Sequence, residues 1–109
     1  MRSFKLSTVL SLLFLMLAPI AHADAQPTLT TWYQCPFSAD CVASRHYPKG
    51  TVLSIHNPKT GRSARGVVRD YGPEAWTGRA LDVSKQIAAQ LGMISTGVET
   101  LDVQVVGRL

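Results

Sequence analysis

The sequence predicts a small, mainly β barrel with one short helix, and three observations support this fold class. The chain has 109 residues, which suffices for one domain. Five to six short segments rich in β-branched and aromatic residues lie between turns with Gly and Pro, a pattern typical of a small barrel. Only one segment has the periodicity and the end residues of a helix. These features exclude a multidomain enzyme, a cofactor-binding Rossmann fold and a TIM barrel.

Residues 1–23 have the three parts of a secretory signal peptide. Arg2 and Lys5 make the start positive, residues 6–20 are almost wholly apolar, and Ala21-His22-Ala23 has the small residues of a cleavage site. The alternative is a transmembrane anchor, but about 15 apolar residues fall short of the roughly 20 that a spanning helix needs. We therefore expect a mature domain, residues 24–109, that is periplasmic or secreted and has no stable membrane anchor.

The charge of the chain gives little reason to expect a nucleic-acid partner. The 11 basic and 7 acidic residues give a formal net charge of +4. Arg2 and Lys5 belong to the predicted signal peptide, so nine basic and seven acidic residues remain, a net charge of +2. The remaining Lys and Arg are scattered and form no basic stripe with aromatic residues between them. A mild positive charge suits an anionic envelope polymer, and we expect no nucleic acid to bind.

The chain has two cysteines, Cys35 and Cys41. In an exported protein, a close pair is more typical of a disulfide than of a metal or redox site. Closing so short a loop contributes about 2 kcal/mol. Free thiols are the alternative. Only His46 and His56 accompany the cysteines in the domain, so we expect no metal and no organic cofactor.

Four segments combine β-branched or aromatic residues with flanking turn residues, which predicts strands. They cover residues 29–34, 51–56, 63–69 and 80–83. The turn between the second and third contains Asn57-Pro58-Lys59-Thr60-Gly61, in which Pro presets φ and Gly supplies a positive φ. Gly66, inside the third strand, indicates a bulge.

Two early segments are expected to be irregular. Residues 24–28 are a polar lead that contains Pro27, and residues 35–47 contain Pro36, Asp40 and both cysteines. Near the other end, residues 101–105 alternate apolar and polar side chains, which predicts a half-buried strand.

The segment from Ser84 to Leu91 predicts the single helix. Ser84 is a suitable N-terminal cap, and Ile87, Ala88 and Leu91 share one face. Gly92 follows where a left-handed residue ends a helix.

Two aspartates have positions suited to chemistry. Asp70 ends a strand and opens the turn Asp70-Tyr71-Gly72-Pro73, and Asp82 faces opposite to Leu81 and Val83 in an alternating strand. Asp70 has a structural alternative as a turn-initiating carboxylate, and Asp82 has one as a partner of the helix dipole. Paired carboxylates can do acid/base work. A spacing of twelve residues does not fix their distance in space.

Five motifs follow one another in an order that resembles the rare lipoprotein A (RlpA)-like family, with Thr31-Trp32-Tyr33 before them and Gly97-Val98 after. The motifs are Tyr47-Pro48-Lys49-Gly50-Thr51, Asn57-Pro58-x-x-Gly61-Arg62-Ser63, Arg69-Asp70-x-Gly72-Pro73, Gly78-Arg79-x-Leu81-Asp82-Val83-Ser84 and Ala88-Ala89-x-Leu91-Gly92-Met93. The resemblance covers roughly residues 29–106.

The resemblance implies a six-stranded double-psi β-barrel, a fold shared with expansins and some lytic transglycosylases. It implies a groove for peptidoglycan glycan strands, and cleavage of the MurNAc–GlcNAc bond without water to leave a 1,6-anhydro end. One carboxyl can serve both proton transfers of that reaction, whereas hydrolysis uses two carboxylates. We expect a monomer that acts on glycan without a cofactor.

The resemblance also assigns roles to residues. Asp70 matches the aspartate of the Asp-Arg-Gly-Pro motif, and Asp82 matches that of Ile-Asp-Leu-Ser, both proposed catalytic positions. Ser44 stands where the family often has a histidine, and it is a candidate substrate-binding residue. His46 lies two residues on, the same side of an extended segment, and is a candidate replacement or else an exposed surface histidine. Tyr71 replaces the motif's arginine.

Four aromatic residues are candidates for stacking on sugar rings: Trp32, Tyr33, Tyr71 and Trp76. Core packing is the alternative for Trp32 in its strand, and packing is also the alternative for Trp76. Arg79 is expected to pair with an aspartate or contact a substrate carboxylate, or else to be an ordinary surface arginine.

Three functions remain open from the sequence. The first is a peptidoglycan lytic transglycosylase with Asp70 or Asp82 as general acid/base. The second is a non-catalytic, expansin-like module that binds cell-wall polysaccharide, which Ser44 favours. The third is a small secreted domain that binds another protein.

Overall fold

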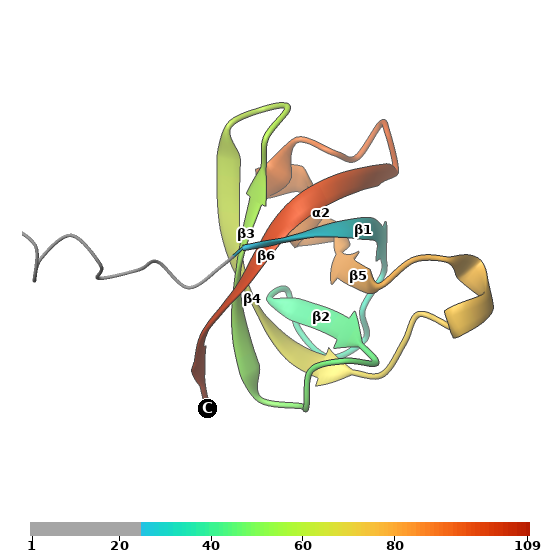
Figure 1. Ribbon diagram of the computed structural model, residues 1–109, viewed down its shortest axis with the longest axis vertical. Helices are drawn as coiled ribbons and strands as arrows, with labels where there is room; N and C mark the ends of the chain where they lie inside the picture. Colours follow the sequence, from blue (N-terminus) through green and yellow to red (C-terminus); the bar gives the residue numbers. More distant parts are fainter. Residues whose placement is uncertain (1–24) are drawn as a thin grey trace, which may run out of the picture.

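Residues 25–109 are described by the computed structural model, in which six strands close into a barrel (Figure 1). The predicted signal peptide, residues 1–23, lies outside the described residues. Within residues 25–109, no helix has the length and hydropathy that crossing a membrane would require.

The barrel combines parallel and antiparallel strand pairs. The elements are β1 (Gln26–Tyr33), β2 (Cys41–Ser44), β3 (Thr51–Asn57), β4 (Arg62–Asp70), the 3-10 helix η1 (Ala75–Thr77), β5 (Leu81–Ser84), α2 (Lys85–Leu91) and β6 (Val98–Arg108). Around the barrel the order is β1-β5-β2-β4-β3-β6, and β6 pairs with β1 to close it. β1 runs parallel to β5, and β2 parallel to β4. This six-stranded barrel fits the double-psi fold and confirms the predicted mainly β class.

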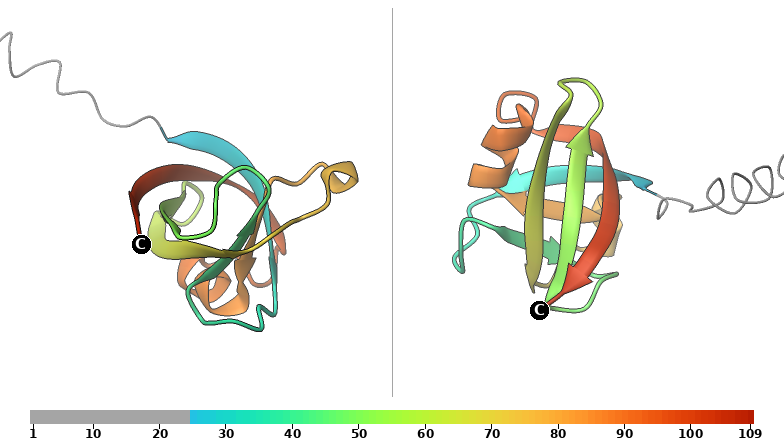
Figure 2. Two further views of the ribbon diagram at one scale, coloured as in Figure 1. Left: turned by 90° about the horizontal axis from the view of Figure 1, so that it is seen from below. Right: turned by 90° about the vertical axis from the view of Figure 1, so that its left-hand side faces the viewer.

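The chain between β4 and β5 extends away from the barrel wall and contains η1 (Figure 2). Gly72 and Pro73 interrupt the strand at the start of this segment, and residues 71–80 lie outside the sheet. In the left view of Figure 2 this segment, coloured yellow to orange, projects away from the strands before it enters β5.

The core and the helix agree with the sequence pattern. Ser84 Oγ accepts a hydrogen bond from Ile87 N at 3.1 Å, and Gly92 ends α2 with φ of 71°. The predicted cap residues are therefore confirmed at both ends. Apolar side chains from β2 to β6 form one buried cluster with those of the helix, and Trp32 of β1 packs against it. Full burial of a large apolar side chain contributes about 1.5–3 kcal/mol. The fully buried ones include Val42, Leu53, Ile55, Val68, Leu81, Val83, Ile87, Leu91, Leu101 and Val103.

The predictions for the two early irregular segments are wrong. Residues 35–47 were expected to be irregular, but β2 lies inside them, and all four of its residues are buried. A strand covered on both faces has no polar alternation for the sequence to display. The polar lead at residues 24–28 is also mostly strand, because β1 begins at Gln26, which pairs with Val103 of β6.

Gly66 is a site of close packing, not a bulge. Its pairing with Leu53 lies in continuous register between β3 and β4. A Cβ at this position would lie 2.5 Å from Val42 Cγ2 and 3.0 Å from Ile87 Cδ1. Glycine therefore lets β2 and α2 approach β4. The register shifts occur elsewhere, in the pairing of β2 with β4 and of β3 with β6.

The cysteines form the predicted disulfide. Cys35 and Cys41 are bonded, with their Cα atoms 6.2 Å apart, and the free-thiol alternative is excluded. The bridge ties the segment after β1 to the first residue of β2.

Candidate functional site

The strand register brings the two predicted aspartates to the same part of the barrel. Ala43 of β2 pairs with Asp70 of β4 on one side and with Asp82 of β5 on the other. Neighbouring strands lie about 4.8 Å apart, so the two Asp Cα atoms are separated by about 10 Å across β2. Asp70 and Asp82, twelve residues apart in the sequence, are thus separated by a single strand in the barrel.

These side chains lie on the outer face of the wall. Leu81 and Val83 point into the core, so Asp82 faces outward, as the alternation predicts. Ala43 lies between the aspartates and presents only a methyl group, which leaves room above it. The result is an open pocket of about 310 Å³. That volume is at the lower end of the range for small-ligand sites.

The pocket combines carboxylates, aromatic rings and one arginine. Its functional side chains are Tyr33, Asp70, Tyr71, Glu74, Trp76, Arg79 and Asp82. Six of these seven were candidates from the sequence: Asp70 and Asp82 as catalytic residues, Arg79 as a partner of an aspartate or of substrate, and Tyr33, Tyr71 and Trp76 as stacking rings. Glu74 was missed, because an exposed glutamate in a polar loop carries no sequence signal.

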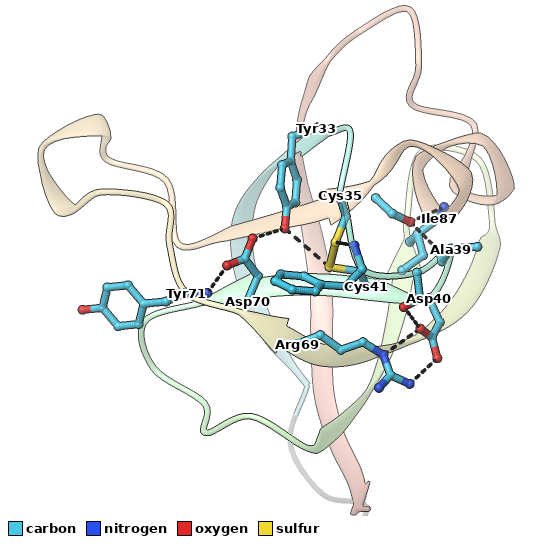
Figure 3. The surroundings of a disulfide bond; sticks show 12 residues. Tyr33, Cys35, Ala39, Asp40, Cys41, Arg69, Asp70, Tyr71 and Ile87 are labelled. Atoms are coloured by element: carbon cyan, nitrogen blue, oxygen red, sulfur yellow. Dashed lines mark hydrogen bonds and ion pairs between the residues drawn. A yellow bond between two sulfur atoms is a disulfide. The ribbon is translucent and has the colours of Figure 1, made fainter.

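Asp70 is held at both carboxylate oxygens (Figure 3). The hydroxyl of Tyr33 donates to Oδ2 at 2.7 Å, and the backbone N–H of Tyr71 donates to Oδ1 at 2.8 Å. Burial raises the pKa of Tyr33, and its hydrogen bond to Asp70 and the charges of Asp70 and Asp82 raise that pKa further. Tyr33 therefore remains a protonated donor beside Asp70 at neutral pH.

Asp82 is held at one oxygen. Thr31 Oγ1 donates to Asp82 Oδ1, and the two residues are partners in the parallel pairing of β1 with β5. Among the described residues, no hydrogen bond reaches Asp82 Oδ2. The sequence did not indicate the contact with Thr31, because it depends on a pairing between strands 51 residues apart.

Two aromatic rings at the pocket face solvent. Tyr71 is 69% exposed and Trp76 is 86% exposed. Trp32, in contrast, packs against the core, and its indole N–H donates to the carbonyl of Ile94 at 3.2 Å. The packing alternative is confirmed for Trp32, and the large exposure of Trp76 contradicts packing there.

Ser44 and His46 lie outside this pocket. Ser44 is buried at the end of β2, and its hydroxyl accepts hydrogen bonds from the backbone N–H groups of His46 and Tyr47, each at 3.0 Å. It therefore holds the turn that leaves β2. His46 is exposed beyond that turn. His46 would share a face with Ser44 only if the strand continued, but β2 ends at Ser44.

Arg79 lines the pocket without an ion pair. Within residues 25–109 the ion pairs are Lys59–Glu99 and Arg69–Asp40, so Arg79 is bound to neither Asp70 nor Asp82. Its buried Nε has no hydrogen-bond partner.

Arg45 attaches the projecting segment to the barrel. It donates to the carbonyl oxygen of Pro73 at 2.6 Å and to that of Arg79 at 3.4 Å. This role was not predicted from the sequence.

The described part of the chain has no group of three or more His, Cys, Asp and Glu side chains placed to hold a metal ion. The expectation of no metal or cofactor stays a prediction.

The fold and the pocket together define a class of protein: a small double-psi-type barrel with carboxylates and exposed aromatic rings on its outer face. Within that class, the chain is similar to two curated proteins that are both named probable endolytic peptidoglycan transglycosylase RlpA. The first, from Nostoc sp., is 39% identical over 67 residues, which are 62% of this chain and 18% of that protein. The second, from Aquifex aeolicus, is 42% identical over 64 residues, which are 59% of this chain and 28% of that protein.

These matches confirm the resemblance to the RlpA-like family that the motifs indicate. The chain aligns with less than a third of the length of either relative. No protein-family profile matches the chain.

Proposed function

We propose that this protein binds peptidoglycan glycan strands in the pocket over β4, β2 and β5 and cleaves them as a lytic transglycosylase. One observation supports this most: Asp70 and Asp82 flank Ala43 in a single open pocket. The names of the two relatives support the same substrate and reaction. Peptidoglycan lies outside the cytoplasmic membrane, in keeping with the predicted signal peptide.

Asp82 is the proposed general acid and base. Its Oδ1 is held by Thr31, which leaves Oδ2 free to face the substrate. The protonated carboxyl donates its proton to the oxygen of the leaving sugar as the C1–O bond breaks. The C6 hydroxyl of the MurNAc ring then attacks C1 of the same ring and gives its proton to the carboxylate. The acid is regenerated, no water is consumed, and the product has a 1,6-anhydro end.

Asp70 has a different proposed role. Both of its oxygens already accept hydrogen bonds, the pattern of an ionised carboxylate, which only accepts. Across β2 from Asp82, it is placed to stabilise the positive charge that develops on the sugar ring as the bond breaks. Tyr71 and Trp76 offer faces for sugar stacking, and the guanidinium group of Arg79, which lines the pocket and makes no ion pair within residues 25–109, offers a donor to a substrate oxygen.

Mass spectrometry of soluble products tests this proposal. Purified protein is incubated with sacculi, both intact and stripped of stem peptides, and anhydro-muropeptides are expected. Asp82→Asn is expected to lower their yield by about 10²–10⁴-fold, the usual contribution of a general acid. Asp102→Asn is the matched control, because it is a half-buried aspartate on β6 outside the pocket. Equal losses in both variants would contradict the assignment.

A non-catalytic wall-binding module is the second candidate. It is favoured by the placement of Ser44 and His46 outside the pocket, which leaves the pocket without a histidine among the described residues. This alternative predicts that the protein pellets with sacculi and releases no soluble product. Trp76→Ala is then expected to lower the bound fraction, because the exposed ring is the proposed stacking surface.

A further inference from the structure

The side chain of Tyr33 contacts Asp70 although the two residues lie on strands that are not neighbours. It is the last residue of β1, which is separated from β4 by β5 and β2 in the barrel order. Its hydroxyl nevertheless reaches Asp70 Oδ2 at 2.7 Å, as Figure 3 shows. The Tyr33 side chain therefore reaches past β5 and β2 to contact a residue at the end of β4. Within residues 25–109, no side chain of β2 or β5 donates a hydrogen bond to the Asp70 carboxylate.

The disulfide lies against the same phenol. The Tyr33 hydroxyl is 3.4 Å from Cys41 Sγ, and Cys41 has no solvent exposure. Cys35, the other half of the bridge, follows Tyr33 by two residues. The phenol is thus confined between a carboxylate and a covalent link that joins the end of β1 to the start of β2 (Figure 3). Rotation of the ring away from Asp70 is opposed by this packing.

A second connection holds the same loop to β4. Asp40 precedes Cys41, and its two carboxylate oxygens accept hydrogen bonds from Arg69 at 2.9 and 3.1 Å. Arg69 in turn precedes Asp70. The backbone carbonyl of Asp40 also accepts from Val67 N at 2.8 Å. Asp40 of the disulfide loop is therefore hydrogen-bonded to Val67 and Arg69, on the strand that carries Asp70.

We propose that Tyr33, confined by the Cys35–Cys41 disulfide, is a positioning residue that holds the Asp70 carboxylate in one rotamer facing the pocket. The inference rests on the proposed function for its effect on activity. The two hydrogen bonds occupy one lone pair on each oxygen, so the remaining lone pairs keep a fixed direction. A carboxylate that must face a developing charge loses effect when it samples other rotamers, because a misplacement of about 1 Å can cost about 100-fold in rate.

The first test is Tyr33→Phe, which keeps the ring and removes the hydroxyl. With solubilised glycan strands, kcat is expected to fall by up to about 100-fold while KM stays within about twofold, because Tyr33 acts through Asp70 and not on substrate binding. Tyr47→Phe is the matched control, since Tyr47 also packs partly buried against the core. A rise in KM with unchanged kcat, or equal losses in both variants, would overturn the inference.

The role of the disulfide is tested by combining variants. Removal of the bridge by Cys35→Ala with Cys41→Ala is expected to lower kcat, and adding Tyr33→Phe is expected to lower it little further. Residues that act through one another give such non-additive losses. Additive losses would show that the bridge does not act through Tyr33 and would overturn that part of the inference.

A readout that needs no activity separates this inference from the proposed function. Three-bond couplings to the Asp70 β protons, measured by NMR, report its χ1 rotamer. A single rotamer is expected in the unmodified protein and rotamer averaging in Tyr33→Phe. A single unchanged rotamer in both overturns the inference, even if the protein is a lytic transglycosylase. Averaging only in the variant upholds it, even if no glycan is cleaved.

Discussion

Gly66 offers the most direct test of how packing holds the site together. It faces Val42 of β2 and Ile87 of α2, and β2 is the strand that separates Asp70 from Asp82. Replacing Gly66 with alanine adds a Cβ that would lie 2.5 Å from Val42 Cγ2. Real Cβ atoms do not approach so closely, so β2 or the helix must shift.

The expected cost of Gly66→Ala follows from that overlap. Forcing an extra methyl group into a packed core costs about 1–3 kcal/mol. The substitution also restricts the unfolded chain, which offsets about 0.4–1 kcal/mol. For a domain of this size, 1 kcal/mol lowers the melting temperature by roughly 4–8 °C. Thermal unfolding followed by circular dichroism is therefore expected to show a fall of several degrees.

Gly107→Ala is the matched control for this prediction. A Cβ at Gly107 would have Val52 Cβ as its nearest neighbour, at an ordinary contact distance of 3.9 Å. The melting temperature is expected to stay the same or rise slightly, because only the unfolded-state effect remains. A melting temperature for Gly66→Ala equal to that of Gly107→Ala would refute the packing argument.

Three further predictions concern charge and exposure. In an absorbance titration of the three tyrosines, Tyr33 is expected to ionise last, and Asp70→Asn is expected to lower the pKa of Tyr33 by removing the negative charge beside its hydroxyl. Hydrogen bonds from Arg69 and Ser38 lower the pKa of Asp40 from 3.8 to about 2. The stabilisation that these bonds give the folded protein is therefore complete above about pH 4 and is lost as the pH falls through about 2. Asp40→Asn is expected to remove that small acid-dependent component from unfolding curves. Trp76→Ala is expected to lower the fraction of protein that pellets with sacculi without changing the melting temperature, because the ring is 86% exposed.

The local features of the fold could be predicted from the sequence. Helix α2 and its two caps depend on side chains within a few residues of one another, and the disulfide depends on two cysteines six apart. The strands with visible alternation or flanking turns were also predictable. β2 was not, because its four residues are buried on both faces and lie between a loop and a turn.

The candidate site could be predicted only in part. Asp70, Asp82, Tyr71 and Arg79 were identified at motif positions and Trp76 as a candidate stacking ring, and the structure places all of them at one pocket. Their proximity could not be predicted, because it depends on Ala43 pairing with two strands at once. Ser44 and His46 were expected at the site, but a turn held by the Ser44 hydroxyl directs the chain away from it.

The central claim is that the carboxylates across β2 cleave glycan without water. Its most direct test is mass spectrometry of the products formed from purified glycan strands in water enriched in heavy oxygen. The proposed reaction predicts 1,6-anhydro ends that contain no oxygen from the solvent, and their loss in Asp82→Asn. Reducing ends that carry the heavy isotope would show hydrolysis and contradict the claim.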